Sequence, residues 1–264
     1  LGKDDQTDFL AISYSTPDII GHSFGPQSIE IEDTYLRLDQ DLERLFKALD
    51  AQVGKDNYVL FLTADHAVVP VPQYFIDNNL PGGYLYLDEP LKKLNEKLVQ
   101  KYGDTLILEQ TNLNIYLDND LIAKKQLDKE EIMEFIKADV STWKGVKRAY
   151  TSTELLQSGA GDVWTEKMKH GYHPSESGDV LFMSEAGYLP KHVESKTGGK
   201  GTSHGSAYAY DSHVPLLWMG KGIEKQSIYR IVNITDITPT LAHILNIAFP
   251  SASTGVPILE ILND

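Results

Sequence analysis

Residues 57–66 read NYVLFLTADH and join an apolar strand to two polar residues at its end. The run 57–64 is unbroken, has the length of a strand, and is stopped by Asp65 and His66. Neighbouring residues on a regular strand face opposite ways, so Asp65 and His66 can reach one common point only where the strand has ended. We therefore expect the chain to leave the strand just before this pair.

Upstream of this strand the chain predicts a helix and a further strand. Residues 28–52 carry apolar side chains at helical spacing, and Gly54 ends the helix. Residues 8–15 (DFLAISYS) have the character of a buried strand that leads into Asp18. Strand, helix and strand in this order predict a right-handed βαβ unit with parallel strands. The expected fold class is α/β, with a mostly parallel central sheet flanked by helices.

Residues 70–170 differ in composition from the rest of the chain. They are richer in Lys, Asp, Glu and Asn, yet they keep amphipathic periods of their own. Helices are predicted near 88–102 and 128–139, with a strand at 111–118 between them. We therefore expect this stretch to form an insertion or cap rather than a linker.

Short apolar runs that are typical of buried core strands return after the insertion. Short apolar strands are predicted at 178–184 and 214–220, and a Gly-, Ser- and Lys-rich loop at 195–206 lies between them. Residues 235–246 predict a helix that is capped by Thr235 or Asp236. The expected division has a core segment 1–70, an inserted cap 71–175 and a second core segment 176–264.

The composition limits the partners that this chain can take. Its 264 residues are 41% hydrophobic and 23% charged, with a formal net charge of −14. Such a surface repels nucleic acid and anionic lipid, so neither a nucleic acid nor a membrane is an expected partner. It also repels phosphate esters, so a site for them would need a strong local source of positive charge. The chain has no cysteine, which leaves its compartment open.

Five polar residues form the candidate chemistry of the chain: Asp18, His22, Asp65, His66 and His204. Ligands of open α/β sheets bind beyond the carboxyl ends of the strands, and we expect the first four residues there. Carboxylate and imidazole together are ligands that suit Zn²⁺. Two such ions about 4 Å apart can assist both the attacking and the leaving oxygen of an in-line displacement. Each motif alone is more often a turn, a helix cap or a chance pair.

Five longer segments resemble the alkaline phosphatase superfamily, and most closely its PafA-type alkaline phosphatases. They are STPDIIGHSFGP (15–26), FLTADHAVVP (61–70), GYHPSESGDVLF (171–182), GTSHGSAYAYDSHVPLLWMG (201–220) and NITDITPTLAHILNI (233–247). They are spread over nearly the whole chain, and the set is far more specific than any one member. The resemblance covers the C-terminal portion of the family fold, so we expect the N-terminal part to lie upstream of Leu1.

The resemblance implies two zinc ions and a division of the ligands between them. One zinc would be held by Asp18, His22 and His204, and the other by Asp65 and His66 together with an aspartate from upstream. The nucleophilic Thr or Ser would also come from upstream, so no catalytic residue is assigned in this chain. The family's members are usually exported, which implies a periplasmic or secreted protein.

Three functions remain open at this point. The first is hydrolysis of phosphate monoesters through a phospho-Thr or phospho-Ser intermediate. The second is a phosphodiesterase or nucleotide pyrophosphatase of the same superfamily, and the third is a metal-binding but catalytically silent fragment. Phosphate-ester small molecules are the expected partners of the two enzymes, and the oligomeric state is left open.

Several further residues are candidates for supporting roles. Asp211 could orient a ligand imidazole, although a role in a turn is commoner for such a residue. His213 either supports the ligands or is a structural histidine, with nothing in the residues to choose between the two. Lys196 and Lys200 could approach a substrate from the Gly-rich loop, but lysines in such loops are mostly solvated.

Overall fold

The structure is a computed structural model that describes residues 1–157, 159, 161–191 and 201–262. The chain divides into two compact units. Unit 1 comprises Leu1–Ser13, Arg37–Asp65 and Val214–Asp264, and unit 2 comprises Tyr14–Leu36 and His66–His213. Within the described residues, no helix combines the length and the apolar character that a membrane crossing requires.

A four-stranded antiparallel sheet forms the centre of unit 2, with the strand order β3-β4-β6-β5. Its strands are β3 (Ile107–Thr111), β4 (Asn114–Leu117), β6 (Val180–Ser184) and β5 (Val146–Thr151). Asn112 and Leu113 join β3 to β4 with φ of 47° and 63°. Two central residues with positive φ give a hairpin turn whose twist matches that of the strands. The pairing shifts register between Ile107 and Glu109 in β3 and between Val146 and Arg148 in β5.

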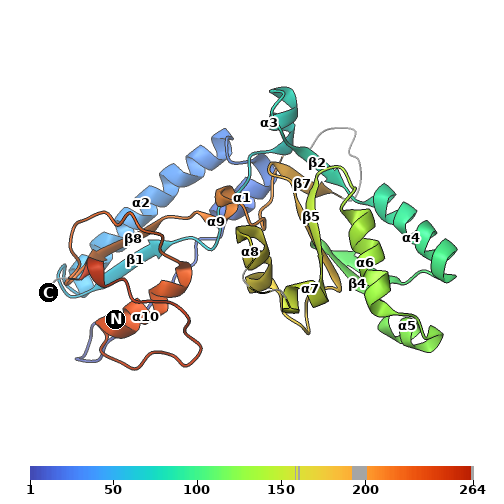
Figure 1. Ribbon diagram of the computed structural model, residues 1–264. Helices are drawn as coiled ribbons and strands as arrows, with labels where there is room; N and C mark the ends of the chain where they lie inside the picture. Colours follow the sequence, from blue (N-terminus) through green and yellow to red (C-terminus); the bar gives the residue numbers. More distant parts are fainter. Residues whose placement is uncertain (158, 160, 192–200, 263–264) are drawn as a thin grey trace. The chain divides into compact units, whose positions relative to one another are not determined.

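Helices cover both faces of this sheet, and the core lies on either side of β6. All five residues of β6 are buried. Val180 and Phe182 pack in one cluster with α4 (Asp88–Tyr102) and α6 (Lys129–Val140). Leu181 and Met183 pack in a second cluster with α7 (Ser152–Gln157) and α8 (Val163–Gly171). Alternate residues of a strand face opposite ways, and Figure 1 shows α6 on one side of β5 and α8 on the other.

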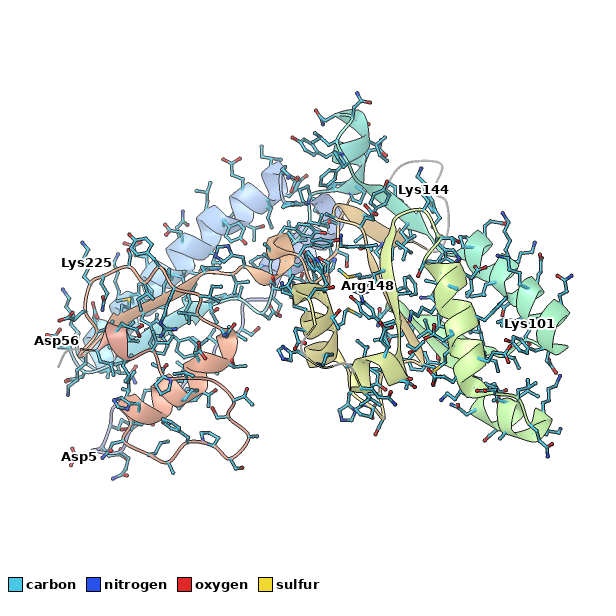
Figure 2. All side chains as sticks on the ribbon, viewed as in Figure 1. Asp5, Asp56, Lys101, Lys144, Arg148 and Lys225 are labelled. Atoms are coloured by element: carbon cyan, nitrogen blue, oxygen red, sulfur yellow. The ribbon has the colours of Figure 1, made fainter. Side chains whose placement is uncertain are left out.

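Ion pairs lie around these clusters. Lys101, near the end of α4, lies 2.8 Å from the Glu131 carboxylate of α6. Arg148 of β5 donates to Asp162 at 2.7 Å, at the start of α8 (Figure 2). Both pairs are exposed to solvent, where an ion pair contributes only about 0–1 kcal/mol. The buried apolar side chains therefore carry the stability of unit 2, at about 1.5–3 kcal/mol for each large residue that is fully buried.

Shorter elements complete unit 2. The strands β2 (Gly83–Tyr86) and β7 (Tyr188–Lys191) are paired in parallel. The helices are α1 (Thr16–Phe24), α3 (Pro72–Asp77), α5 (Asn119–Lys125) and α9 (Ala209–Ser212). The boundary between the two units falls inside α2 (Ile29–Gln52), after Leu36.

Unit 1 contains a two-stranded antiparallel sheet of β1 (Val59–Thr63) and β8 (Leu216–Gly220). Phe61 and Trp218 are paired across it, with their ring centroids 5.1 Å apart. The helix α10 (Ile237–Ile244) lies between two short 3₁₀ turns, η1 (Ile234–Asp236) and η2 (Leu259–Ile261). Asp236, one of the two residues predicted as its cap, is the N-cap of α10, but its side chain makes no capping hydrogen bond to this helix.

The expected α/β class is confirmed, and most of the predicted elements form within two residues of their expected ends. The predicted strand at 8–15 is wrong. No described strand pairs with it, and Phe9, Leu10 and Ile12 are 69%, 51% and 49% exposed. The predicted parallel βαβ unit is therefore not formed, and β1 pairs with β8 instead. An apolar run shows that a segment avoids water, but a strand also needs a hydrogen-bonded neighbour. The division at 70 and 175 stays a prediction.

Candidate metal centre

Asp18 and His22 lie on the helix α1 rather than in a loop after a strand. Asp18 is in the first turn and His22 in the last, four residues on, so both side chains are on one face of the helix. The Asp18 Oδ1 atom lies 3.3 Å from His22 Nε2. The signal that marks this helix is Pro17 in its first turn, where the fixed φ of proline favours a helical start.

Two further histidines face the same carboxylate. His204 Nε2 lies 3.6 Å from Asp18 Oδ1, and His66 Nε2 lies 3.8 Å from it. The His66 and His204 rings are stacked, with centroids 3.4 Å apart and planes 12° apart. His22 and His204 are tilted neighbours at 5.1 Å. Three imidazoles from three separate segments of the chain thus converge on Asp18.

Backbone carbonyls hold the far nitrogens of two of these rings. His22 Nδ1 lies 2.9 Å from the Thr202 carbonyl oxygen, and His66 Nδ1 lies 3.0 Å from the Ala67 carbonyl oxygen. A carbonyl can only accept, so we assign the ring proton to Nδ1 in both cases. Nε2 then carries the lone pair, and it is this atom that faces Asp18. A neutral imidazole held in this way is oriented as a metal ligand.

The loop with His204 is held close to α1 and to the segment after His66. A Cβ atom at Gly201 would lie only 1.7 Å from the His22 carbonyl oxygen, so glycine permits this approach. The buried Thr202 hydroxyl donates to the Val69 carbonyl at 2.6 Å. Long-range contacts therefore position His204, although its loop is neither helix nor strand.

The cluster is half-buried, which matches a site that must admit a small molecule. The side chains of Asp18 and His22 are 43% and 39% exposed, and those of His66 and His204 are 24% and 28% exposed. Burial lowers the pKa of His204, and the nearby His66 lowers it further, against the opposite effect of Asp18. A lowered pKa favours the neutral ring, which is the form that binds a metal.

Asp65 lies two residues after the end of β1 and is exposed, so the expectation that the strand has ended before Asp65 and His66 is confirmed. Asp65 belongs to unit 1, whereas the four clustered residues belong to unit 2.

Among the supporting candidates, Asp211 is buried and lies in α9, and His213 is exposed at the end of that helix. Lys196 and Lys200 lie outside the described residues.

The donor set defines what the cluster can hold. One ligand atom each from Asp18, His22 and His204 lies within 4.8 Å of the others, which is close enough to share one ion. A carboxylate and two imidazoles are a donor set that fits Zn²⁺ and other borderline divalent ions. Fold and site together define an α/β protein with a carboxylate–histidine group that could hold a metal.

Residues 1–207 match the type I phosphodiesterase / nucleotide pyrophosphatase family. The chain belongs to this family, which lies within the alkaline phosphatase superfamily. The expected resemblance is therefore confirmed.

Curated relatives and one solved structure agree with this assignment. The chain is 36% identical to alkaline phosphatase PafA of Elizabethkingia meningoseptica, over 99% of this chain and 47% of the relative. It is 38% identical to alkaline phosphatase PhoV of Synechococcus elongatus, over 99% of this chain and 46% of the relative. A protein named calcium-transporting ATPase from Myroides odoratus is 37% identical, over 96% of this chain and 46% of the relative. The crystal structure of wild-type PafA superposes with a TM-score of 0.90, over 99% of this chain and 49% of that one. The chain thus spans about half the length of the relatives that it matches.

Proposed function

We propose that the protein to which this chain belongs hydrolyses phosphate monoesters with two bound zinc ions. The observation that carries the proposal is the convergence of three histidine Nε2 atoms on the Asp18 carboxylate. The similarity to proteins named alkaline phosphatase supports the choice of monoesters. Bound zinc would supply positive charge for a phosphoryl group, which a chain of net charge −14 otherwise repels.

In this proposal Asp18, His22 and His204 hold one ion, and Asp65 and His66 contribute to the other. His66 Nε2 lies 3.8 Å from Asp18 Oδ1, so a ligand of the second ion would lie beside the ligands of the first. The carbonyls of Thr202 and Ala67 keep the two imidazoles oriented. The nucleophile and one further aspartate would come from residues outside this chain. A periplasmic or secreted location follows from the resemblance and remains part of the proposal.

The test measures zinc content and hydrolysis of p-nitrophenyl phosphate in the full-length gene product. We expect His22→Ala and His204→Ala each to lose about one zinc while the other is retained, with a fall in kcat/KM of at least about 100-fold. His170→Ala is the matched control, because His170 is an exposed histidine of α8 in the same unit. Equal zinc content in all three variants and the parent would refute the ligand assignment.

A phosphodiesterase is the second candidate, because the matching family is described by that activity. The distinguishing substrate is bis-p-nitrophenyl phosphate. A higher kcat/KM for the monoester supports the first proposal, and a higher value for the diester supports this one. If the zinc-loaded protein hydrolyses neither ester, both enzymatic functions are excluded and metal binding without catalysis remains.

A further inference from the structure

Asp211 is hydrogen-bonded to both of the segments that carry the stacked histidines. Its side chain is part of a residue that is only 4% exposed. The Oδ2 atom accepts from the Ser206 N–H at 2.7 Å, two residues after His204. The Asp211 carbonyl accepts from the Ala67 N–H, also at 2.7 Å, directly after His66. One residue therefore joins the two segments.

The hydrogen bonds of Asp211 hold two segments that lie outside the helices and strands. The residues around His66 and His204 are in neither helix nor strand, so no ladder of backbone hydrogen bonds fixes their rings. Yet the rings are stacked at 3.4 Å, and both Nε2 atoms face the same carboxylate. Movement of either segment by about 1 Å would spoil the geometry of a metal site, since ligand distances must hold within about 0.2 Å.

The second carboxylate oxygen of Asp211, Oδ1, indicates a role beyond that of a turn residue. Oδ1 is buried and has no hydrogen-bond partner among the described residues. A buried charged oxygen without a donor is costly. A cation held beside His204 would offset this cost, because the negative charge of Asp211 acts on His204 and would act on that cation as well.

We propose that Asp211 is a positioning residue of the metal centre: its backbone carbonyl holds the segment of His66, its carboxylate holds the loop of His204, and the charge of that carboxylate stabilises the bound cation. The inference rests on the proposed zinc site but concerns a residue outside the ligand set. The Asp211 side chain makes two separate contributions to the metal centre. The hydrogen bond to Ser206 orders the loop, and the negative charge raises metal affinity.

Two substitutions separate these contributions in the full-length protein. Asp211→Asn keeps an oxygen that can accept from Ser206 but removes the charge, whereas Asp211→Ala removes both. Asp179→Asn is the matched control, because Asp179 Oδ2 accepts the Leu117 N–H at 2.7 Å in the same unit and away from the ligands. The measurements are zinc affinity, by competition with a chromophoric chelator, and Tm of the metal-free protein.

We expect Asp211→Asn to weaken zinc binding about 10- to 100-fold, as loss of a supporting residue around a metal does, with a small change in the metal-free Tm. Asp211→Ala should weaken it at least as much and lower the Tm, and Asp179→Asn should change only the Tm. Unchanged zinc affinity in Asp211→Asn would overturn the charge contribution, and unchanged affinity in a folded Asp211→Ala would overturn the inference altogether. A parent protein that binds no zinc would instead refute the proposed function.

Discussion

Gly201 and Gly21, two glycines near His22, differ in the space that surrounds them. At Gly201 the loop backbone lies against the carbonyl of His22, and any side chain there would overlap it. At Gly21, directly before His22, an added Cβ meets no described atom within 4 Å. The close approach therefore occurs at Gly201 and not at Gly21, although Gly21 is the neighbour of His22 in the sequence. The requirement for glycine thus arises from a contact between segments that are far apart in the sequence.

We predict that Gly201→Ala separates the loop from α1 and disrupts the metal site. The Cβ would have to move away from backbone atoms, which cannot rotate aside as a side chain can. Zinc affinity should fall at least about tenfold, comparable to the loss of a supporting residue. Isothermal titration with zinc measures the effect.

Gly21→Ala is the control for this prediction. Alanine is favoured over glycine inside a helix by about 1 kcal/mol, so this variant should bind zinc normally and be slightly more stable. Zinc affinity in Gly201→Ala equal to that of Gly21→Ala and the parent would show that the contact at Gly201 does not position the metal site.

The identities of the site residues could be predicted from the sequence, but their arrangement could not. A carboxylate and an imidazole four residues apart suggest a shared ligand whether the backbone is helical or not. The hydrogen bond from His22 to the Thr202 carbonyl spans 180 residues, and no local pattern encodes such a partner. The same holds for the bond from Thr202 to Val69, which spans 133 residues.

Among the elements, the turn η1 before α10 shows how a single side chain fixes a boundary. Asp236 is 4% exposed, and its two oxygens accept from the Asn233 and Val256 backbone N–H groups, each at 2.9 Å. It therefore caps the start of η1, in a capping box with Asn233, and also holds the later segment at Val256. The Thr240 hydroxyl adds a second link, since it accepts from the Ile258 N–H at 2.9 Å.

We predict that Asp236→Ala destabilises the protein by about 2–4 kcal/mol, because it breaks the capping box of η1 and leaves the partly buried N–H groups of Asn233 and Val256 without this acceptor. Thr238→Ala, an exposed change in α10, should alter stability by less than about 0.5 kcal/mol. Urea unfolding followed by circular dichroism gives both values. If the two variants unfold at the same urea concentration, the hydrogen bonds of the Asp236 side chain do not stabilise the protein.

Elements with strong periodicity were predictable, whereas their pairing was not. The helices at 29–52, 88–102 and 129–140 follow from apolar spacing that is visible in the sequence. The segment 8–15 has the same apolar character as β1 but pairs with no described strand. Strand pairing depends on partners that may lie anywhere in the chain, so a local pattern cannot supply it.

For the molecule as a whole, the buried apolar residues are unevenly distributed between the units. Most of the fully buried large side chains, including Leu94, Ile132 and Phe182, belong to unit 2. In unit 1, Leu217 and Met219 of β8 are 61% and 41% exposed. Because local stability follows buried apolar contact, the two units should open with different free energies.

Hydrogen exchange followed by mass spectrometry measures this difference in the 264-residue chain. We expect peptides from β5 and β6 to exchange at least about tenfold more slowly than peptides from β1 and β8, a gap of about 1.4 kcal/mol in opening free energy. Exchange in all four strands at one common rate would mean that the chain opens as a single cooperative body.

The register shifts in β3 and β5 have a consequence for how the molecule behaves in a crowded solution. These are the outer strands of the four-stranded sheet, and each combines a bulge with a charged residue, Glu109 in β3 and Arg148 in β5. A bulge interrupts the even row of donors and acceptors that a foreign strand would need, and a charge makes its approach unfavourable. Both borders of the sheet are thereby unsuited to recruiting strands from neighbouring copies, which protects this part of the chain from fibril-like growth.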